Sequence, residues 1–196
     1  APSRVMRDYL RELGIHHARH QPLGVDPTTF HPARRTRDLR AELGLAPDAR
    51  LLLYAGRFSR EKRIDVLREA FRRLGPPYEL VLLGGAATRQ LERNVRTLPY
   101  RNDPAELAAW MASADALVHA GTEETFGLVV LEAMACGRPV VGTRASAMPE
   151  LVSDDVGLLA RPGDAADLAD AIAGLYDMDV EGMGRAARAR VMQHFT

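Results

Sequence analysis

The sequence has few of the residues that build cross-linked or thiolate-bound folds. Its 196 residues include a single cysteine, Cys136, which excludes an internal disulfide framework and a zinc site made of several thiolates. No apolar run approaches the roughly 18 residues that a membrane span needs. The first residues lack both the apolar stretch of a signal peptide and an initiator methionine. The scarcity of cysteine predicts a reducing compartment such as the cytoplasm. The missing initiator methionine predicts that the chain is a fragment.

Lysine is as scarce as cysteine. Of the 26 basic residues, 25 are arginines and one, Lys62, is a lysine, which singles out that position. The basic residues are balanced by 26 acidic ones, which argues against a dedicated nucleic-acid binder and a polybasic membrane module. Residues 1–75 nevertheless carry 16 basic against 9 acidic side chains, so an anionic ligand is best sought there.

Short apolar runs alternate with amphipathic stretches, which is the pattern of an α/β protein with a parallel sheet. Strands are predicted at 51–54, 80–83, 116–119 and 140–141, and helices at 3–13, 64–74, 103–114, 128–135, 164–175 and 181–194. The strands are apolar throughout, which predicts a sheet covered on both faces. The predicted fold is a Rossmann-like, doubly wound parallel sheet. Residues 24–27 and the basic stretch 34–40 are expected to form a junction rather than core.

The first candidate motif follows the strand at 51–54. Gly56 and Arg57 stand at the end of that strand, and Lys62 is expected to start the next helix. Ligands of open α/β sheets bind outside the carboxyl ends of the strands, and helix N-termini attract anions. Arg57 and Lys62 are therefore candidates for an anion site, with a pair of solvated surface cations as the alternative.

The second candidate motif runs from 123 to 139. Glu124 precedes a helix that begins near Gly127, where main-chain N–H groups are expected to be unpaired. A carboxylate at that place can accept sugar hydroxyls while the amides face a phosphate. Glu132, in the second helical turn, can hold a ribose diol, as acidic residues do in dinucleotide sites. The alternative is an exposed helix residue, which the apolar neighbours of Glu132 disfavour.

Together the two motifs resemble glycosyltransferase family four, a family of retaining enzymes with the GT-B fold. The resemblance rests on Gly-Arg-Phe-Ser-Arg-Glu-Lys at 56–62 and Glu-x-Phe-Gly-x4-Glu-Ala-Met-Ala-x-Gly-x-Pro-Val-Val at 124–141. Residues 22–32 resemble the family's crossing between its two domains. The resemblance implies that residues 1–21 hold the last helix of the N-terminal domain and a linker, and that 22–196 form the C-terminal nucleotide-sugar-binding domain.

The resemblance also implies roles for individual residues. Arg57, Lys62 and Glu124 match the catalytic group, in which the two cations bind the donor diphosphate and the carboxylate touches the donor sugar. The implied donor-binding set is Gly56, Arg57, Lys62, Leu98, Tyr100, Arg101, Glu124, Thr125, Phe126, Gly127, Leu128, Val129 and Glu132. Within it, the amides of 126–128 face sugar and phosphate, Glu132 binds ribose, and 98–101 form the base pocket. No metal and no cofactor are implied, because fixed cations and amides stabilise the leaving diphosphate.

The implied substrate is a nucleoside-diphosphate hexose. The run 119–137 looks most like bacterial mannosyltransferases that use GDP-mannose, while UDP-glucose stays open as donor. The implied partners are this donor and the N-terminal domain of the same protein. The acceptor, a sugar or lipid, is left unassigned, and so is a peripheral association with the inner face of the membrane. Ser146 and Ala147 depart from the Gly-Gly pair that is common in the family.

Other candidates have simpler interpretations. His16, His17 and His20 are too few for a metal site without further ligands. His119 is expected to pack or to position its loop rather than to bind a ligand, and Cys136 to be a small buried helix residue. The arginines of 34–40 are expected to be a solvated face, with a membrane patch as the alternative. Two rival functions remain: a non-catalytic nucleotide-sugar-binding module, and a hexosyl phosphorylase or epimerase.

Overall fold

The computed structural model describes all 196 residues and contains one seven-stranded sheet. The strands are β1 (Arg50–Ala55), β2 (Tyr78–Gly85), β3 (Arg89–Glu92), β4 (Val95–Pro99), β5 (Ala116–Val118), β6 (Val140–Thr143) and β7 (Gly157–Ala160). Their order is β3-β4-β2-β1-β5-β6-β7, and every neighbouring pair is parallel except β3 with β4. The chain therefore winds outward from β1 in one direction and from β5 in the other. The predicted doubly wound parallel sheet is confirmed.

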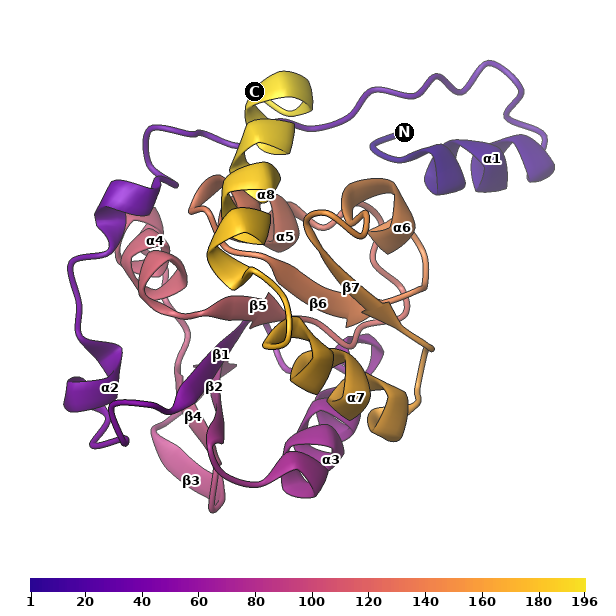
Figure 1. Ribbon diagram of the computed structural model, residues 1–196. Helices are drawn as coiled ribbons and strands as arrows, with labels where there is room; N and C mark the ends of the chain where they lie inside the picture. The colour runs from indigo at the N-terminus through magenta and orange to yellow at the C-terminus, as the bar shows by residue number, and fades with distance from the viewer.

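Helices cover both faces of this sheet (Figure 1). They are α1 (Arg4–Glu12), α2 (Leu39–Glu42), α3 (Ile64–Leu74), α4 (Pro104–Ser113), α5 (Leu128–Ala135), α6 (Met148–Leu151), α7 (Ala165–Leu175) and α8 (Val180–His194), with short 3-10 turns η1 (Pro32–Arg34) and η2 (Arg60–Lys62). Side chains of a strand alternate between faces. Accordingly Leu51 and Leu53 pack in the core beneath α4, α5 and α8, while Leu52 and Tyr54 pack in the core beneath α3 and α7. The strand β1 is therefore apolar throughout because both of its faces are buried, as predicted.

The predicted helix boundaries depend on capping residues that the structure confirms. Ser3 accepts a hydrogen bond from the Met6 amide at the start of α1, Asp103 caps α4, and Asp164 caps α7. Gly137 ends the α5 region with a positive φ of 71°. A side-chain oxygen at the N-cap satisfies an amide that the first helical turn leaves without a partner.

Two edge elements of the sheet were not predicted. The hairpin β3–β4 is antiparallel, and β3 is polar and largely exposed, so it lacks the apolar run of a central strand. The other edge strand, β7, is only four residues long and half of it is partly exposed. Edge strands carry a weaker hydrophobic signal because one side of each has no neighbouring strand.

The prediction that residues 24–27 and 34–40 stay out of the core is wrong. Val25 and Leu39 are buried at no more than 8% exposure and join the core beneath α4, α5 and α8, and Phe30, between the two stretches, is buried with them. Arg40 also turns inward, and its Nη2 lies 2.7 Å from Asp115 Oδ2. Isolated apolar residues in an irregular segment leave no periodic pattern in the sequence, which is why this part of the core was missed.

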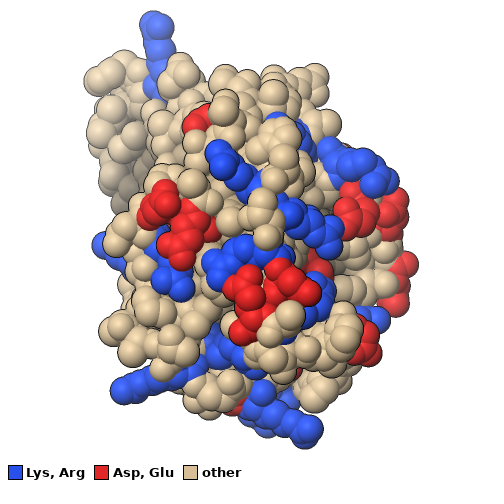
Figure 2. Space-filling view, turned by 90° about the vertical axis from the view of Figure 1, so that its left-hand side faces the viewer, with Lys and Arg blue, Asp and Glu red and all other residues tan.

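The face that carries α2 shows no polybasic patch. Figure 2 shows blue and red side chains interspersed over it. Within the arginine-rich stretch, Arg37 pairs with Glu42 and lies over the Trp110 ring, and Arg35 pairs with Glu181. None of the helices combines the length and apolarity of a membrane span.

The helix α1 lies apart from the sheet, beside α6 (Figure 1). No residue of α1 is buried, and its attachment is made at its first turn. Ser3 Oγ donates to the carbonyl of Thr125 at 2.7 Å, and Glu150 accepts from the amides of Arg4 and Val5 at 2.9 Å each. The helix is therefore attached to the body through hydrogen bonds at its N-terminus rather than through an apolar face.

Candidate functional site

The two sequence motifs meet at the point where the strand order reverses. The segment after β1 carries Gly56 and Arg57, and the segment after β5 leads through Glu124 into α5. Because β1 and β5 are parallel neighbours, both segments leave the same edge of the sheet. Ligands of doubly wound sheets bind in the crevice at this switch point. The topology therefore places both motifs where a ligand site is expected.

An ion pair joins the motifs. Lys62 Nζ lies 2.6 Å from Glu124 Oε2, and both side chains are mostly shielded from solvent. The prediction that Lys62 starts the following helix is wrong: Lys62 ends the turn η2, and α3 begins at Ile64. Arg63 between them has a left-handed φ of 50°, which breaks the helical path. This break turns Lys62 toward the loop after β5.

His119 completes the surroundings of Glu124. Its Nε2 lies 3.4 Å from Glu124 Oε2, and its side chain is 2% exposed. The contacts with His119 and with Lys62 lower the pKa of Glu124 to about 2 against the opposing effect of burial. A partly buried carboxylate held by two donors stays ionised at neutral pH. The site thus contains a fixed negative charge next to a fixed positive one.

Main-chain amides at the start of α5 have no acceptor within the chain. The N–H groups of residues 126–129 make none of the hydrogen bonds in the structure, as expected for a first helical turn without a side-chain cap. Gly127 occupies the N-cap with a φ of 95°, which a side chain would strain. The unpaired amides and the helix dipole present positive potential beside Lys62 and Glu124.

A cleft of about 230 Å³ lies beside these amides. It is lined by Ala55, Gly56, Leu83, Tyr100, Arg101, Leu107, Leu128, Val129 and Glu132. Six of the predicted donor-binding residues are therefore brought together along one cavity. Burial raises the pKa of Glu132, so this residue is not the solvated helix position of the alternative interpretation. The cleft is mostly apolar and contains the carboxylate of Glu132 and the guanidinium of Arg101. Such a lining suits a ligand in which a flat ring is joined to a diol.

Some predicted residues lie outside this cleft. Leu98 is 8% exposed and packs in the core, and the Phe126 ring is buried against Phe195. Thr125 instead lines a separate cavity of about 400 Å³ between α1 and the loop after β5. Arg57 is exposed and makes no ion pair, while the Tyr54 hydroxyl donates to its carbonyl at 2.9 Å. The Arg57 side chain is therefore free to meet a ligand, whereas its backbone is fixed.

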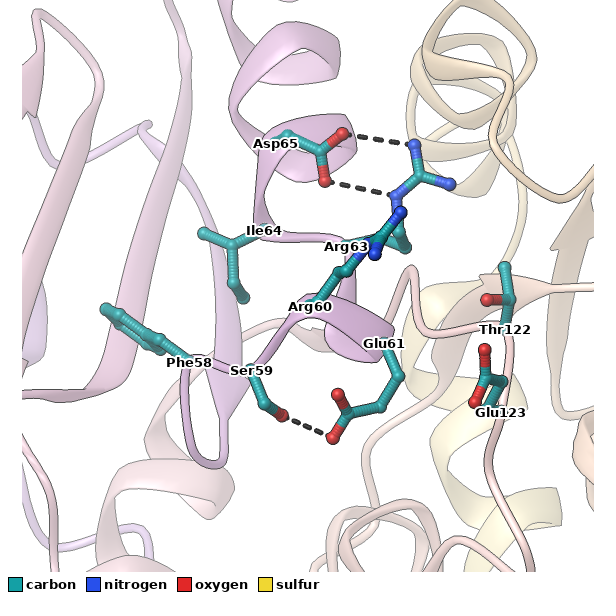
Figure 3. Close-up of a pocket in the computed structure, with 9 residues that line it drawn as sticks. All are labelled: Phe58, Ser59, Arg60, Glu61, Arg63, Ile64, Asp65, Thr122 and Glu123. Atoms are coloured by element: carbon teal, nitrogen blue, oxygen red, sulfur yellow. Dashed lines mark hydrogen bonds and ion pairs between the residues drawn. The ribbon is translucent and has the colours of Figure 1, made fainter.

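A wider polar cavity of about 980 Å³ flanks the same two segments. Figure 3 shows it between η2 with the start of α3 on one side and Thr122 and Glu123 on the other. Arg63 is paired with Asp65, and Glu61 is bonded to Ser59, within this lining. Arg60 makes no ion pair. The segments that carry Lys62 and Glu124 thus have ligand-sized space on this side as well.

No group of three or more His, Cys, Asp or Glu side chains is arranged to hold a metal ion. His16 and His17 are exposed on the segment after α1. Cys136 is fully buried, and burial raises the pKa of its thiol to about 12, as expected for a packing residue.

Comparison with known proteins decides the family. The profile of the family described as Glycosyl transferases group 1 matches residues 49–178, about two thirds of the chain and both motifs. The chain belongs to the group 1 glycosyl transferases.

Curated relatives of this group 1 domain include two named sugar transferases. The D-inositol 3-phosphate glycosyltransferase of Arthrobacter sp. (strain FB24) is 40% identical over 186 residues, which are 85% of this chain and 44% of that protein. The GDP-mannose-dependent alpha-(1-6)-phosphatidylinositol dimannoside mannosyltransferase of Mycobacterium tuberculosis is 40% identical over 148 residues, 71% of this chain and 39% of that protein. The chain spans less than half the length of these relatives.

The fold of this group 1 domain also has close counterparts. The crystal structure of HepE from Anabaena in complex with UDP and glucose matches it with a TM-score of 0.86 and 27% identity, over 100% of this chain and 58% of that one. The seven-stranded sheet is therefore the α/β arrangement of a GT-B glycosyltransferase, as the resemblance predicted.

Two residues in the loop after β5 and near α6 make contacts that the sequence did not predict. His119 was expected to pack or position its loop. It does position the loop, because its Nδ1 accepts from the Gly121 amide at 3.2 Å, but it also reaches Glu124. Ser146 takes a left-handed φ of 49°, a conformation that favours glycine, and its Oγ donates to the Thr122 carbonyl at 2.8 Å. Only the folded loops reveal these partners.

Proposed function

We propose that this chain is the donor-binding half of a retaining hexosyltransferase. The observation that carries the proposal is the convergence of Lys62, Glu124, the free amides at the start of α5 and the Glu132 cleft at one switch point. A cation and amides suit a diphosphate, and carboxylates suit sugar hydroxyls. A nucleoside-diphosphate sugar carries all of these groups in one molecule.

Each part of the donor has a proposed partner. The diphosphate lies between Lys62, the exposed Arg57 and the amides of residues 126–129. The ribose diol binds Glu132, and the base occupies the cleft beside Tyr100 and Arg101. In this arrangement the nucleotide runs from the cleft toward Glu124, so that the hexose arrives at the Lys62–Glu124 pair.

The proposed chemistry is transfer with the anomeric configuration kept. As the bond to the hexose breaks, negative charge develops on the leaving diphosphate, and Lys62, Arg57 and the amides stabilise that charge because they are already aimed at it. These groups supply the positive charge for the step, so the proposal needs no metal. Glu124 is held by Lys62 and His119 and serves to bind the hexose rather than to form a covalent intermediate.

GDP-mannose is the favoured donor. The Mycobacterium relative, 40% identical, is named for its dependence on GDP-mannose, which supports this choice. HepE, whose crystal structure holds UDP and glucose, supports UDP-glucose as the alternative. The two donors differ in both base and hexose, so a direct binding comparison separates them.

Residues 1–21 are proposed to be the last helix and linker of a preceding domain that binds the acceptor, with 22–196 as the nucleotide-sugar domain. The exposed apolar side chains of Val5 and Tyr9 on α1, and of Leu13 just after it, support this division, because they pack into no core of this chain. The protein is proposed to work in the cytoplasm, with a peripheral contact to the inner membrane face if its acceptor is a lipid.

Calorimetric titration of the chain with GDP, UDP, GDP-mannose and UDP-glucose tests the proposal. We expect GDP and GDP-mannose to bind, and the Lys62→Ala substitution to weaken their binding. Binding of UDP and UDP-glucose alone would support the proposed transferase but would make UDP-glucose its donor in place of GDP-mannose. Absence of heat with all four at millimolar concentration would contradict a donor site in this chain.

A further inference from the structure

His119 is a buried side chain whose two ring nitrogens have different partners. Its Nδ1 accepts a hydrogen bond from the Gly121 amide at 3.2 Å, so Nδ1 carries no proton in the neutral ring. The proton of the neutral imidazole is therefore on Nε2. That nitrogen lies 3.4 Å from Glu124 Oε2, which makes the Glu124 carboxylate its nearest charged partner.

The two donors to Glu124 share one oxygen. Lys62 Nζ lies 2.6 Å from Oε2, and His119 Nε2 faces the same atom. The other oxygen, Oε1, accepts no hydrogen bond from any group of the chain. An ionised carboxylate has acceptor capacity on both oxygens. The arrangement therefore holds one oxygen inside the protein and leaves the other for a ligand.

The His119 ring is itself fixed by its surroundings. Tyr54 stacks beside it, with ring centroids 6.2 Å apart and planes inclined by 29°. A Cβ at Gly121 would lie 2.5 Å from His119 Cε1, so only glycine allows the ring this close. The ring is thus held between β1 and the loop after β5, and it transmits that rigidity to Glu124.

We propose that His119 is a positioning residue that holds Glu124 Oε2, so that Oε1 is presented to a hydroxyl group of the donor hexose. This inference rests on the proposed donor site. It goes further by naming the residue that makes Glu124 an effective binding group for the hexose. Lys62 alone would hold Oε2 through one contact from a flexible side chain, whereas His119 adds a second contact to the same oxygen from a buried ring. A fixed acceptor binds a hydroxyl without first losing conformational freedom.

The test compares affinities for the bare nucleotide and for the nucleotide sugar in the same variants. His119→Asn keeps an acceptor for the Gly121 amide but is too short to reach Glu124, and His119→Gln has an amide donor near the position of Nε2. Calorimetry gives Kd for GDP and GDP-mannose, or for UDP and UDP-glucose if those bind. The informative quantity is the ratio of the two dissociation constants within each variant.

We expect His119→Asn to weaken the binding of the nucleotide sugar about tenfold relative to that of the bare nucleotide. This is the effect expected from the loss of one charge-assisted hydrogen bond. His119→Gln should restore most of the ratio. In a Glu124→Ala background His119→Asn should cause no further loss, because the group it positions is absent. Thermal melting of every variant checks that each is folded.

An unchanged ratio in His119→Asn, with bare nucleotide still bound, would overturn the role of His119 and leave the donor site intact. A ratio that falls equally in the Gln and Asn variants, or that falls again in the Glu124→Ala background, would also overturn it, because loss of packing would then be the cause. Failure of the unaltered chain to bind any nucleotide would instead contradict the proposed function.

Discussion

Lys62 Nζ and Glu124 Oε2 lie 2.6 Å apart although 62 positions separate them in the sequence. The contact forms because the parallel pairing of β1 with β5 directs both following segments to one edge of the sheet. It joins the only lysine of the chain to the carboxylate of the second motif. The same lysine is expected to meet the donor diphosphate, so Glu124 holds it in place for that task.

Replacing Lys62 with alanine is expected to weaken nucleotide binding by roughly 10- to 150-fold. This is the effect of losing a charge-assisted hydrogen bond to phosphate of about 1.5–3 kcal/mol. Arg57→Ala should have an effect of similar size, because its exposed guanidinium is proposed to bind the same diphosphate. Calorimetric Kd values for the bound nucleoside diphosphate measure both.

Arg73→Ala is the matched control for this change. It removes one positive charge from an exposed position near the end of α3, where Arg73 pairs with Glu69. Donor affinity should stay within twofold. Equal weakening in Arg73→Ala and Lys62→Ala would attribute the effect to net charge rather than to the site.

Glu124 is expected to stabilise the fold only above the pH range in which it titrates. Its pKa is lowered from 4.5 to about 2 in the folded protein, so its contribution is present above about pH 5 and disappears as pH falls toward 2. The free energy of unfolding should therefore exceed that of Glu124→Gln by up to about 3 kcal/mol at pH 7. Urea denaturation from pH 7 to pH 3 should show this difference shrinking, and a difference independent of pH would contradict the pairing.

Glu132 is expected to bind the ribose through its carboxylate. Glu132→Gln should weaken the bound nucleoside diphosphate by at least about tenfold, because a charged acceptor is replaced by a neutral one. With the 2′,3′-dideoxy nucleotide the same substitution should change Kd by no more than twofold. Equal losses with both nucleotides would place the ribose elsewhere.

The same carboxyl group predicts a pH dependence of binding. Burial raises the pKa of Glu132, so the group becomes protonated at a higher pH than an ordinary glutamate. Nucleotide affinity should therefore fall as pH decreases through this raised pKa, and Glu132→Gln should remove that fall. Calorimetry between pH 8 and pH 5 measures it.

Gly127→Ala is expected to destabilise the protein by about 2–3 kcal/mol. A left-handed backbone costs a residue with a side chain about 1–2 kcal/mol, and the added Cβ would also lie 3.1 Å from Leu151 Cδ1. Gly163→Ala is the control, since Gly163 has a φ of 76° but meets only the flexible end of Arg63 at 3.6 Å. Urea denaturation should show a smaller loss for the control.

The sequence predicted the central sheet and most helices because each has its own local signal. The apolar run of β1, the Asp103-Pro104 start of α4 and the Gly137 end of α5 all correspond to features of the structure. The polar edge hairpin β3–β4 lacks such a signal. The same holds for Phe30 and Leu39, whose burial depends on helices that pack over them.

For the site, the sequence supplied the residue types and the topology brought them together. Spacing alone put Glu124 and Glu132 on either side of the start of α5, where the structure has them. It gave no indication that Arg63 would break the helix after Lys62, or that His119 and Lys62 would share one oxygen of Glu124. Such contacts depend on side-chain direction and on the packing of Tyr54, which no one-dimensional pattern records.

The crystal structure of this chain with GDP-mannose tests the central claim most directly, with GDP and UDP-glucose as further ligands. The account predicts the diphosphate within hydrogen-bonding distance of Lys62, Arg57 and the amides of residues 126–129, the ribose at Glu132, and the hexose at Glu124 Oε1. A nucleotide bound away from the edge where β1 and β5 end, with Lys62 and Glu124 untouched, would contradict it.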